Sequence, residues 1–280
     1  MVMSLLMEVK HLLKQYNIKP KRRLGQNFVV CNSLISKMVD SANIGSDDIV
    51  LEIGAGLGFL TRKIAERARK VIAVEIDAKL INILKFLLKD FENVNVIHAD
   101  VLKLNINNVD KIVSNVPFNI SSPLLFKMAQ EITFKLAVLT LQKEFVDRML
   151  AQPGSKDYGR LSVTSNFFFQ IDFLGNVSRR CFYPQPEVDV SLIRLIPKKT
   201  FLQNNLILFF LDFVRIIFTC KNKKLKNALD VYFRFKNVPE KMHNDIVCKI
   251  PFMEKRVVEL DLNELYMIAS LLYDQFNLNF

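Results

Sequence analysis

Residues 51–61 read LEIGAGLGFLT, a short apolar run followed by glycines at alternate positions. The run that ends at Ile53 predicts a buried strand, and residues 59–70 predict the helix that follows it. Glycines at 54, 56 and 58 permit a tight turn and let a ligand approach bare backbone. A dinucleotide-binding turn has a third glycine where this chain has Phe59, so the pattern differs from that fingerprint. The stretch therefore predicts a strand, a ligand-binding turn and a helix.

The same alternation of strand and helix continues on both sides of this turn. Further strands are predicted at 71–76, 94–100, 111–116 and 135–141. Further helices are predicted at 33–44, 78–91, 122–132 and 142–150. Strands that alternate with helices indicate an α/β fold, in which a parallel sheet is covered on both faces. Ligands of such sheets bind beyond the carboxyl ends of the strands.

The pattern changes after residue 199. Three long segments with helical periodicity follow, at 204–218, 223–235 and 262–276. We therefore expect two domains: a catalytic domain at 1–199, with a basic N-terminal segment and a helix near 4–16, and a smaller all-helical domain at 200–280.

The charge balance favours a polyanionic partner. The chain has 39 lysines and arginines against 28 acidic residues, a net charge of +11. One basic cluster lies at 19–23, and a second comprises Lys221, Lys223, Lys224 and Lys226. Each cluster alone is also typical of a solvated face, but two of them favour a nucleic-acid surface.

Other classes of protein are disfavoured. Asp212 and Arg215 interrupt the longest apolar stretch, so no membrane span is expected, and no secretory signal is recognised. The cysteines lack the spacing of metal ligands, so we expect no metal site and reduced thiols in a cytoplasmic protein. They are Cys31, Cys181, Cys220 and Cys248.

Acidic residues close the next two predicted strands. Glu75 lies about twenty residues beyond the glycine turn, where a carboxylate can accept both hydroxyls of a ribose. Asp100 closes the following strand and can accept from an adenine amino group. These groups suit an adenosine without a pyrophosphate, and hence S-adenosylmethionine better than NAD. The alternative is a simple turn with two helix-capping acids.

Asn115 closes the fourth strand, in the sequence NVPF. An adenine amino group is a poor nucleophile, because its lone pair is delocalised into the ring. The Asn115 oxygen and a nearby carbonyl, such as that of Val116, can accept its hydrogens and aim the lone pair at a methyl donor. Pro117 can stiffen the loop, and Phe118 can stack on an extracted base. The alternative is a proline turn with a packed phenylalanine.

Several motifs together resemble the small-subunit ribosomal RNA adenine dimethyltransferases. They run in order along the chain: LGQNFVV (24–30), LEIGAGLGFLT (51–61), VIAVEID (71–77), HADVL (98–102), NVPFNISSP (115–123), YGRLSV (158–163), FYPQPEVDVSLIRL (182–195) and FTCKNKKLKNAL (218–229). The resemblance implies a Rossmann-like, seven-stranded class I methyltransferase sheet with a small helical C-terminal domain.

The resemblance also implies roles for individual residues. The implied cofactor-binding residues are Gln26, Asn27, Val29, Gly54, Gly56, Glu75, Ile76, Asp100, Val101 and Asn115. The implied catalytic residues are Asn115, Pro117 and Phe118. The implied contacts to the target base or RNA are Phe118, Phe182, Lys221, Lys223, Lys224 and Lys226. Two positions depart from the family pattern, which more often has leucine at Val29 and tyrosine at Phe118.

The implied activity is transfer of four methyl groups from S-adenosylmethionine to two adjacent adenines near the 3′ end of small-subunit RNA. The implied partner is an immature ribosomal subunit, and we expect a monomer. One alternative is an adenine methyltransferase for DNA or another RNA, although DNA enzymes usually have a proline where this chain has Val116. Another is an assembly or transcription factor that has lost catalysis.

Overall fold

The computed structural model describes residues 4–198 and 204–279. The chain forms two compact units, one made of residues 1–146 and 169–197, the other of residues 147–168 and 198–280. The boundary predicted between residues 199 and 200 lies outside the described residues.

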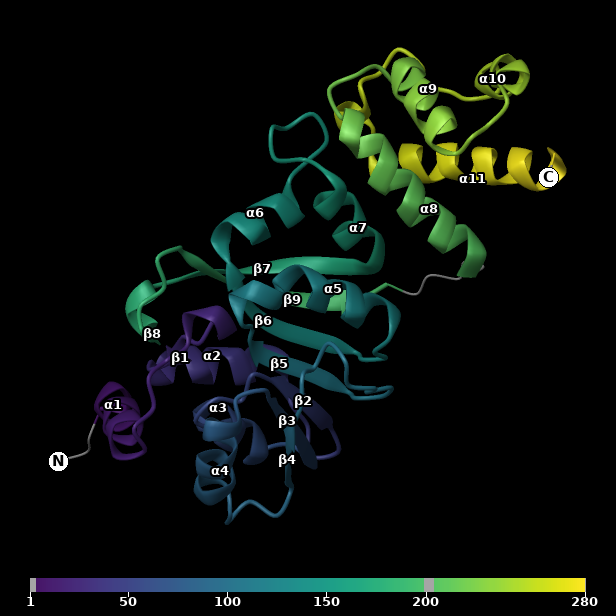
Figure 1. Ribbon diagram of the computed structural model, residues 1–280. Coiled ribbons are helices and arrows are strands. Elements are labelled where there is room, and N and C mark those ends of the chain that lie inside the picture. Colours follow the sequence, from purple (N-terminus) through teal and green to yellow (C-terminus); the bar gives the residue numbers. More distant parts are fainter. Residues whose placement is uncertain (1–3, 199–203, 280) are drawn as a thin grey trace. The chain divides into compact units, whose positions relative to one another are not determined.

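The first unit is built on a seven-stranded sheet (Figure 1). Its strands, in spatial order, are β4 (Val94–His98), β3 (Lys70–Glu75), β2 (Ile49–Ile53), β5 (Lys111–Asn115), β6 (Leu136–Gln142), β9 (Val190–Pro197) and β7 (Phe169–Val177). The first five are parallel, and β9 is antiparallel to both β6 and β7. The predicted α/β fold is therefore confirmed.

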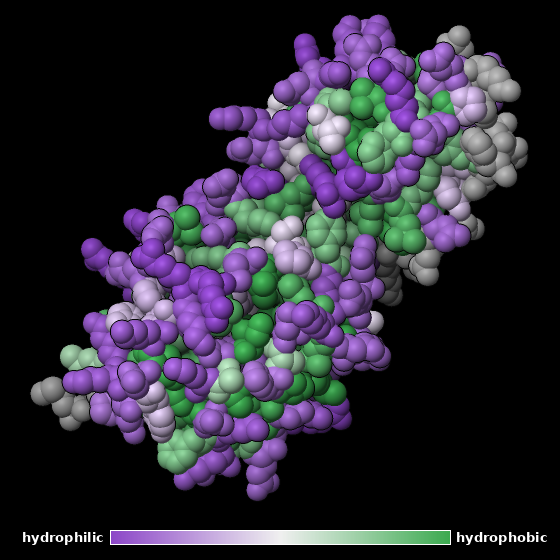
Figure 2. Space-filling model, in the orientation of Figure 1, coloured by the Kyte–Doolittle hydropathy of each residue, from purple (hydrophilic) through white to green (hydrophobic). Residues whose placement is uncertain are grey.

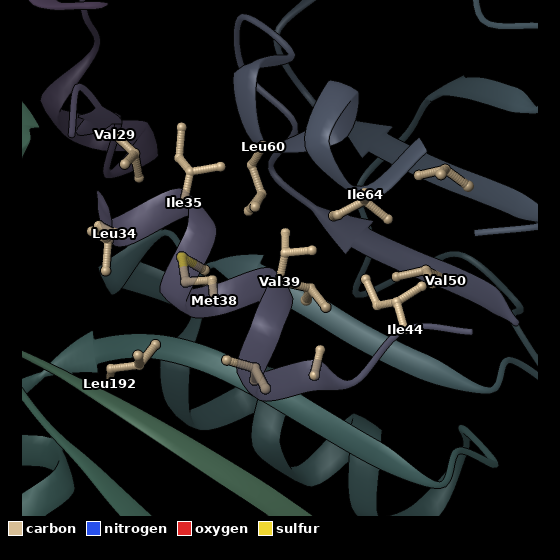
Figure 3. Packing of buried hydrophobic residues seen from close by; sticks show 14 of the residues in the cluster. Val29, Leu34, Ile35, Met38, Val39, Ile44, Val50, Leu60, Ile64 and Leu192 are labelled. Carbon is tan, nitrogen blue, oxygen red and sulfur yellow. The ribbon is translucent and has the colours of Figure 1, made fainter. Parts of the chain in front are cut away.

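Three helices cover one face of the sheet. They are α2 (Asn32–Ala42), α3 (Phe59–Ala65) and α4 (Ala78–Leu87). Met38 and Val39 of α2 are fully buried against Ile64 of α3 and the strand residue Val50 (Figure 3). Burial of such side chains stabilises a fold by about 1.5–3 kcal/mol each.

The opposite face of the sheet is also buried. Leu51 and Ile53 alternate along β2 with Val50 and Glu52, and the exposed fraction of all four is at most 2%. Neighbouring residues of a strand point to opposite faces, so both faces are covered, as expected for parallel strands. The helices α5 (Ser121–Gln130) and α6 (Lys143–Leu150) follow β5 and β6.

One predicted segment differs from the structure. The helix expected to run to Lys70 ends at Ala65, because the side chain of Asn93 donates to the carbonyls of Ala65 and Ala68 and terminates the helix. Further along the chain, helix α7 (Arg160–Phe168) leads directly into the edge strand β7.

The chain before the sheet packs beside the glycine turn. Helix α1 (Leu5–Gln15) begins at Ser4, whose hydroxyl accepts from the N–H of Met7. It buries Val9 in a cluster with Phe28 and Leu57. After a short 3-10 turn (Arg22–Leu24), strand β1 (Phe28–Val29) pairs antiparallel with β8 (Phe182–Tyr183), which a second 3-10 turn (Arg179–Cys181) precedes.

The second unit is helical. Besides α7 it contains α8 (Asn204–Ile217), α9 (Leu225–Phe235), α10 (Glu240–Val247), α11 (Leu262–Asn279) and the 3-10 turns Phe218–Cys220 and Val257–Glu259. Its core is aromatic, with Phe213 and Tyr232 in edge-to-face contact at 5.3 Å. The loop before α7 belongs to this unit, since the buried hydroxyl of Tyr158 donates to the carbonyl of Leu260 at 2.8 Å. Helix α10 was not predicted.

The surface is largely hydrophilic. Hydrophilic side chains cover most of the face shown in Figure 2. None of the helices in the described part of the chain is long and apolar enough to cross a membrane. Among the same residues, no group of three or more His, Cys, Asp or Glu side chains is arranged to hold a metal ion.

Gly58 is a position where the fold requires glycine. Its φ is +81°, and an added Cβ would lie 2.7 Å from Cδ1 of Leu84, a fully buried residue of α4. We expect Gly58→Ala to lower the free energy of unfolding by about 2–3 kcal/mol, because it combines left-handed strain with overpacking. Urea-induced unfolding measures this change. Gly159→Ala is the control, since no atom lies within 4 Å of its added Cβ. Equal stability of the two variants would show that the fold does not require glycine at position 58.

Candidate active site

A cavity that opens to solvent lies at the carboxyl ends of the parallel strands. Clefts at this edge of a parallel sheet are the usual place for a small-molecule ligand. The predicted site residues that line it are Gln26, Asn27, Val29, Gly54, Gly56, Glu75, Ile76, Asp100, Val101, Asn115 and Pro117. Residues from five separate stretches of the sequence therefore meet at one cavity.

The cavity opens where the strand order reverses. The chain passes from β2 outward to β3 and β4, and returns to the other side of β2 with β5. The pairing of β2 with β5 covers only Val50 with Lys111 and Leu51 with Ile112. Beyond it, the hydroxyl of Ser114 donates to the carbonyl of Ile53 at 2.7 Å. Such a switch point is the usual ligand site of an open α/β sheet.

The glycine turn forms one wall of the cavity. Gly54 and Gly56 have φ values of +73° and +59°. A Cβ on Gly54 would lie 3.1 Å from the ring of Pro117, and one on Gly56 would lie 3.2 Å from the ring of Phe28. Bare backbone is therefore required here by close neighbours as well as by the turn itself.

Glu75 is buried at the end of β3 and accepts two backbone hydrogen bonds. The N–H of Gly56 donates to Oε2 at 2.9 Å, and the N–H of Asp77 donates to Oε1 at 2.8 Å. Burial raises the pKa of Glu75 above its usual value, and these two bonds act against the rise. Each carboxylate oxygen has a further lone pair with which to accept a ligand hydroxyl.

Residues 21–29, here called the N-terminal segment, are fastened to the sheet beside Glu75. The ammonium of Lys21 lies 2.7 Å from Oδ1 of Asp77, and the amide of Gln26 donates to Oδ2 at 2.9 Å. The Gln26 oxygen in turn accepts from the N–H of Lys21 at 2.8 Å. Burial alone would raise the pKa of Asp77, but the bonds from Lys21 and Gln26 lower it below its usual value.

Asp100 and Ile76 lie at the adjoining edge of the cavity. Oδ1 of Asp100 accepts from the N–H of Leu102 at 3.0 Å, which leaves Oδ2 without a partner among the described residues. Ile76 is 46% exposed, so an apolar side chain stands open next to a carboxylate. An apolar surface beside a free acceptor can bind a flat base that carries an amino group.

The side-chain amide of Asn115 is bonded at both ends. Its Nδ2 donates to the backbone carbonyl of Asn27 in the N-terminal segment at 2.7 Å. Its Oδ1 accepts from Oγ1 of Thr140 on the neighbouring strand β6 at 2.6 Å. The amide therefore has a defined position in the lining of the cavity.

Six of the predicted site residues lie elsewhere. Phe118, the first residue of a 3-10 turn, is half-buried against the core cluster, and Phe182 is 1% exposed within that cluster. The four predicted lysines lie in the second unit. Two of them, Lys224 and Lys226, pair with Glu254 at 2.6 and 2.7 Å and lower its pKa to about 2.

The other two lysines differ from each other. Lys221 donates to the backbone carbonyls of Lys156 and Tyr158 at 2.9 and 3.3 Å, and so holds the loop before α7. Lys223 is exposed, and in the described part of the chain its ammonium has no hydrogen-bond or ion-pair partner.

Three residues of the site were not assigned roles from the sequence. Asp77 carries the signal of a helix N-cap, and its side chain does accept from the N–H of Lys79, but its pairing with Lys21 has no local signal. Thr140 lies within an ordinary apolar strand. Glu52 lines the cavity, and its Oε2 has no hydrogen-bond partner within residues 4–198 and 204–279.

The sheet order with its antiparallel β9, the glycine turn at the switch point and the acidic strand ends define a class I S-adenosylmethionine-dependent methyltransferase. A family model described as ribosomal RNA adenine dimethylase matches residues 17–266. The chain belongs to this family.

Individual relatives agree with the family. The chain is 39% identical over 274 residues to a probable ribosomal RNA small subunit methyltransferase A of Methanosarcina mazei, covering 97% of this chain and 100% of the relative. It resembles the crystal structure of a dimethyladenosine transferase from Plasmodium falciparum, with a TM-score of 0.77, 33% identity and coverage of 89% and 98%. It also resembles the crystal structure of the 23S rRNA methyltransferase ErmE, with a TM-score of 0.66 and 26% identity, covering 88% of this chain and 100% of that structure.

Glu52 makes the stability of the protein depend on pH. It is 2% exposed, and burial, with the nearby charge of Glu75, raises its pKa to about 8. In the unfolded chain the Glu52 carboxyl loses its proton near its usual pKa of about 4.5, whereas in the folded protein it keeps the proton up to about pH 8. The contribution of the protonated Glu52 to the free energy of unfolding is therefore full below pH 4.5 and is lost as the pH rises through 8. Glutamine does not titrate, so Glu52→Gln should avoid this loss. We expect the variant to gain free energy of unfolding over the wild-type protein between pH 5 and pH 8, by on the order of 3 kcal/mol.

Chemical unfolding at both pH values, for the wild-type protein and the variant, measures this difference. If the free energy of unfolding changed by the same amount in both proteins between the two pH values, Glu52 would have an ordinary pKa in the folded protein.

Proposed function

We propose that this protein transfers methyl groups from S-adenosylmethionine to the N6 amino groups of two adjacent adenines near the 3′ end of small-subunit ribosomal RNA, giving N6,N6-dimethyladenosine. The observation that carries the proposal is the position of the Asn115 amide in the lining of a cavity with carboxylate acceptors for an adenosyl group. The relative named for small-subunit methylation matches this chain over nearly its whole length.

The residues of the cavity fit S-adenosylmethionine. Gly54 and Gly56 line the cavity without side chains of their own, which suits the methionine part of the donor. Glu75 can accept from the ribose hydroxyls, and the free oxygen of Asp100 can accept from the adenine amino group. Ile76 and Val101 supply apolar contacts to the base. Gln26, Asn27 and Val29 close the cavity from the N-terminal segment.

S-adenosylmethionine, when bound, supplies an electrophilic methyl group on a sulfonium. The protein orients the target amino group, whose hydrogens are accepted by Oδ1 of Asn115 and the carbonyl of Val116. Hydrogen bonds to both hydrogens favour a tetrahedral nitrogen with its lone pair free. The alkylated nitrogen loses a proton readily, so no strong base is required. Positioning of the reactants supplies most of the rate.

Two aromatic residues belong to the proposed base site in different ways. Phe118 follows Pro117 directly, and a half-buried ring at this loop can stack on an extracted adenine. Phe182 is buried in the core cluster, and its strand β8 pairs with β1 of the N-terminal segment. Its proposed role is therefore to hold the N-terminal segment in place and not to contact the base.

We assign the helical region at 200–280 to binding of RNA or the ribosomal subunit. The basic cluster at 221–226, between α8 and α9, supports this assignment, although not all of its lysines are free to pair with phosphate. Lys223 is exposed and without a partner in the described chain, whereas Lys224 and Lys226 share Glu254. Lys223 is therefore the member of the cluster best able to pair with phosphate.

The activity is tested by incubating the protein with a labelled methyl donor and immature small ribosomal subunits. We expect label in two adjacent adenines of the 3′-terminal hairpin, identified as dimethyladenosine by mass spectrometry. Label confined to DNA or large-subunit RNA would assign a different substrate, and binding of subunits without label would indicate an assembly factor.

Asn115→Ala should lower the rate of methyl transfer by about two orders of magnitude or more, as expected when a positioned acceptor is lost. Single-turnover transfer to small subunits measures the rate, and calorimetry measures donor binding. Donor affinity should change by less than about tenfold, since Glu75, Asp100 and the glycine turn remain in place. Asn82→Ala, at an exposed position of α4, is the control. Transfer at the wild-type rate by the Asn115 variant would remove this residue from the mechanism.

Lys223→Ala should weaken binding to small-subunit RNA and reduce the slope of log affinity against log salt concentration by about one. Glu254→Gln should have the opposite effect, because it releases Lys224 and Lys226 for phosphate. Filter binding over a series of salt concentrations measures both effects. Lys249→Ala, in the same unit, controls for the loss of one charge. An unchanged slope in both variants would place the RNA surface elsewhere.

A further inference from the structure

The amide of Asn115 is held by one group that can only accept and one that can donate. The acceptor is the backbone carbonyl of Asn27, 2.7 Å from Nδ2. The donor is the hydroxyl of Thr140, 2.6 Å from Oδ1. The parallel register of β5 and β6 sets Asn115 opposite Thr140, and Thr140 is completely buried.

This arrangement settles which end of the amide faces which way. A hydroxyl alone could bond to either end of an amide, because it both donates and accepts. A backbone carbonyl can bond only to the NH₂ end, so Nδ2 must face Asn27. Oδ1 then faces Thr140, whose hydroxyl has to donate to it. The orientation follows from the partners and does not depend on telling nitrogen from oxygen.

We propose that Thr140 is a positioning residue, which together with the Asn27 carbonyl holds the Asn115 amide so that its oxygen can accept from the amino group of the target adenine. This inference rests on the proposed function, in which that oxygen accepts a hydrogen from the nucleophile. An amide oxygen has two lone pairs, so it can accept from Thr140 and from the substrate at once. If the amide turned over, its NH₂ group would face the substrate NH₂ group, and two donors would oppose each other.

Thr140 does not have the usual contacts of a buried strand threonine. Most side-chain hydrogen bonds in proteins go to backbone or water. The hydroxyl of Thr140 goes instead to a single side chain, at the one place where β5 ends beside the cavity. The neighbouring Ser114 shows the more common arrangement, because its hydroxyl donates to the backbone carbonyl of Ile53.

The test compares Thr140→Val, which keeps the shape and removes the donor, with Thr140→Ser, which keeps the donor and removes a methyl group. We expect Thr140→Val to lower kcat for methyl transfer about tenfold, with little change in the KM for the donor, because one orienting hydrogen bond is lost. Thr140→Ser should keep most of the activity. Thermal unfolding of both variants verifies that each is folded.

The side-chain amide signals of Asn115 in NMR spectra supply a readout that needs no turnover. They should shift in Thr140→Val and stay near their wild-type positions in Thr140→Ser. Equal kcat values and unshifted signals in Thr140→Val would overturn the inference. Equal losses in both variants would also overturn it, since they would indicate packing by the methyl group. If the wild-type protein transferred no methyl groups, the proposed function would fail, and the amide signals alone would decide the role of Thr140.

Discussion

The parallel pairing of β2 with β3 on one side and β5 on the other is the constraint on which the site depends. Parallel strands end at the same edge, so Gly54, Glu75 and Asn115 meet although sixty residues separate the first from the last. The reversal of strand order at β2 parts β2 from β5 and makes room for a ligand. A buried sheet core, fixed by ordinary apolar contacts, thereby determines where the polar chemistry takes place.

The N-terminal segment turns this open edge into an enclosed site. Its polar groups bond on two sides of the cavity: to Asp77, close to Glu75, and to the amide of Asn115. The ring of Phe28 also packs on the bare backbone of Gly56. One short stretch of chain thus contacts both the surroundings of the proposed donor and the group proposed to orient the acceptor. Its position links the two halves of the proposed reaction.

The sequence was informative wherever a residue follows from strand periodicity. Glu75, Asp100 and Asn115 could be assigned because each closes a predicted strand, and the ends of parallel strands converge. Asp77 and Thr140 could not, since their partners depend on tertiary register and not on spacing along the chain.

The lysine cluster shows a further limit. Its composition indicated a basic surface, but only the fold reveals that Glu254 neutralises part of it. Long exposed side chains find their partners after the backbone is in place, so local sequence does not specify them.

The two-residue pairing of β1 with β8 also joins residues far apart in the sequence, and it has a consequence for synthesis. Domains fold from the N-terminus as the chain emerges, but residues 28–29 have no strand partner until residues 182–183 have left the ribosome. A nascent chain can assemble β2 to β6, and can bond Gln26 to Asp77 and Asn27 to Asn115, before β1 has its partner strand. The N-terminal segment therefore gains its last backbone pairing only late in translation.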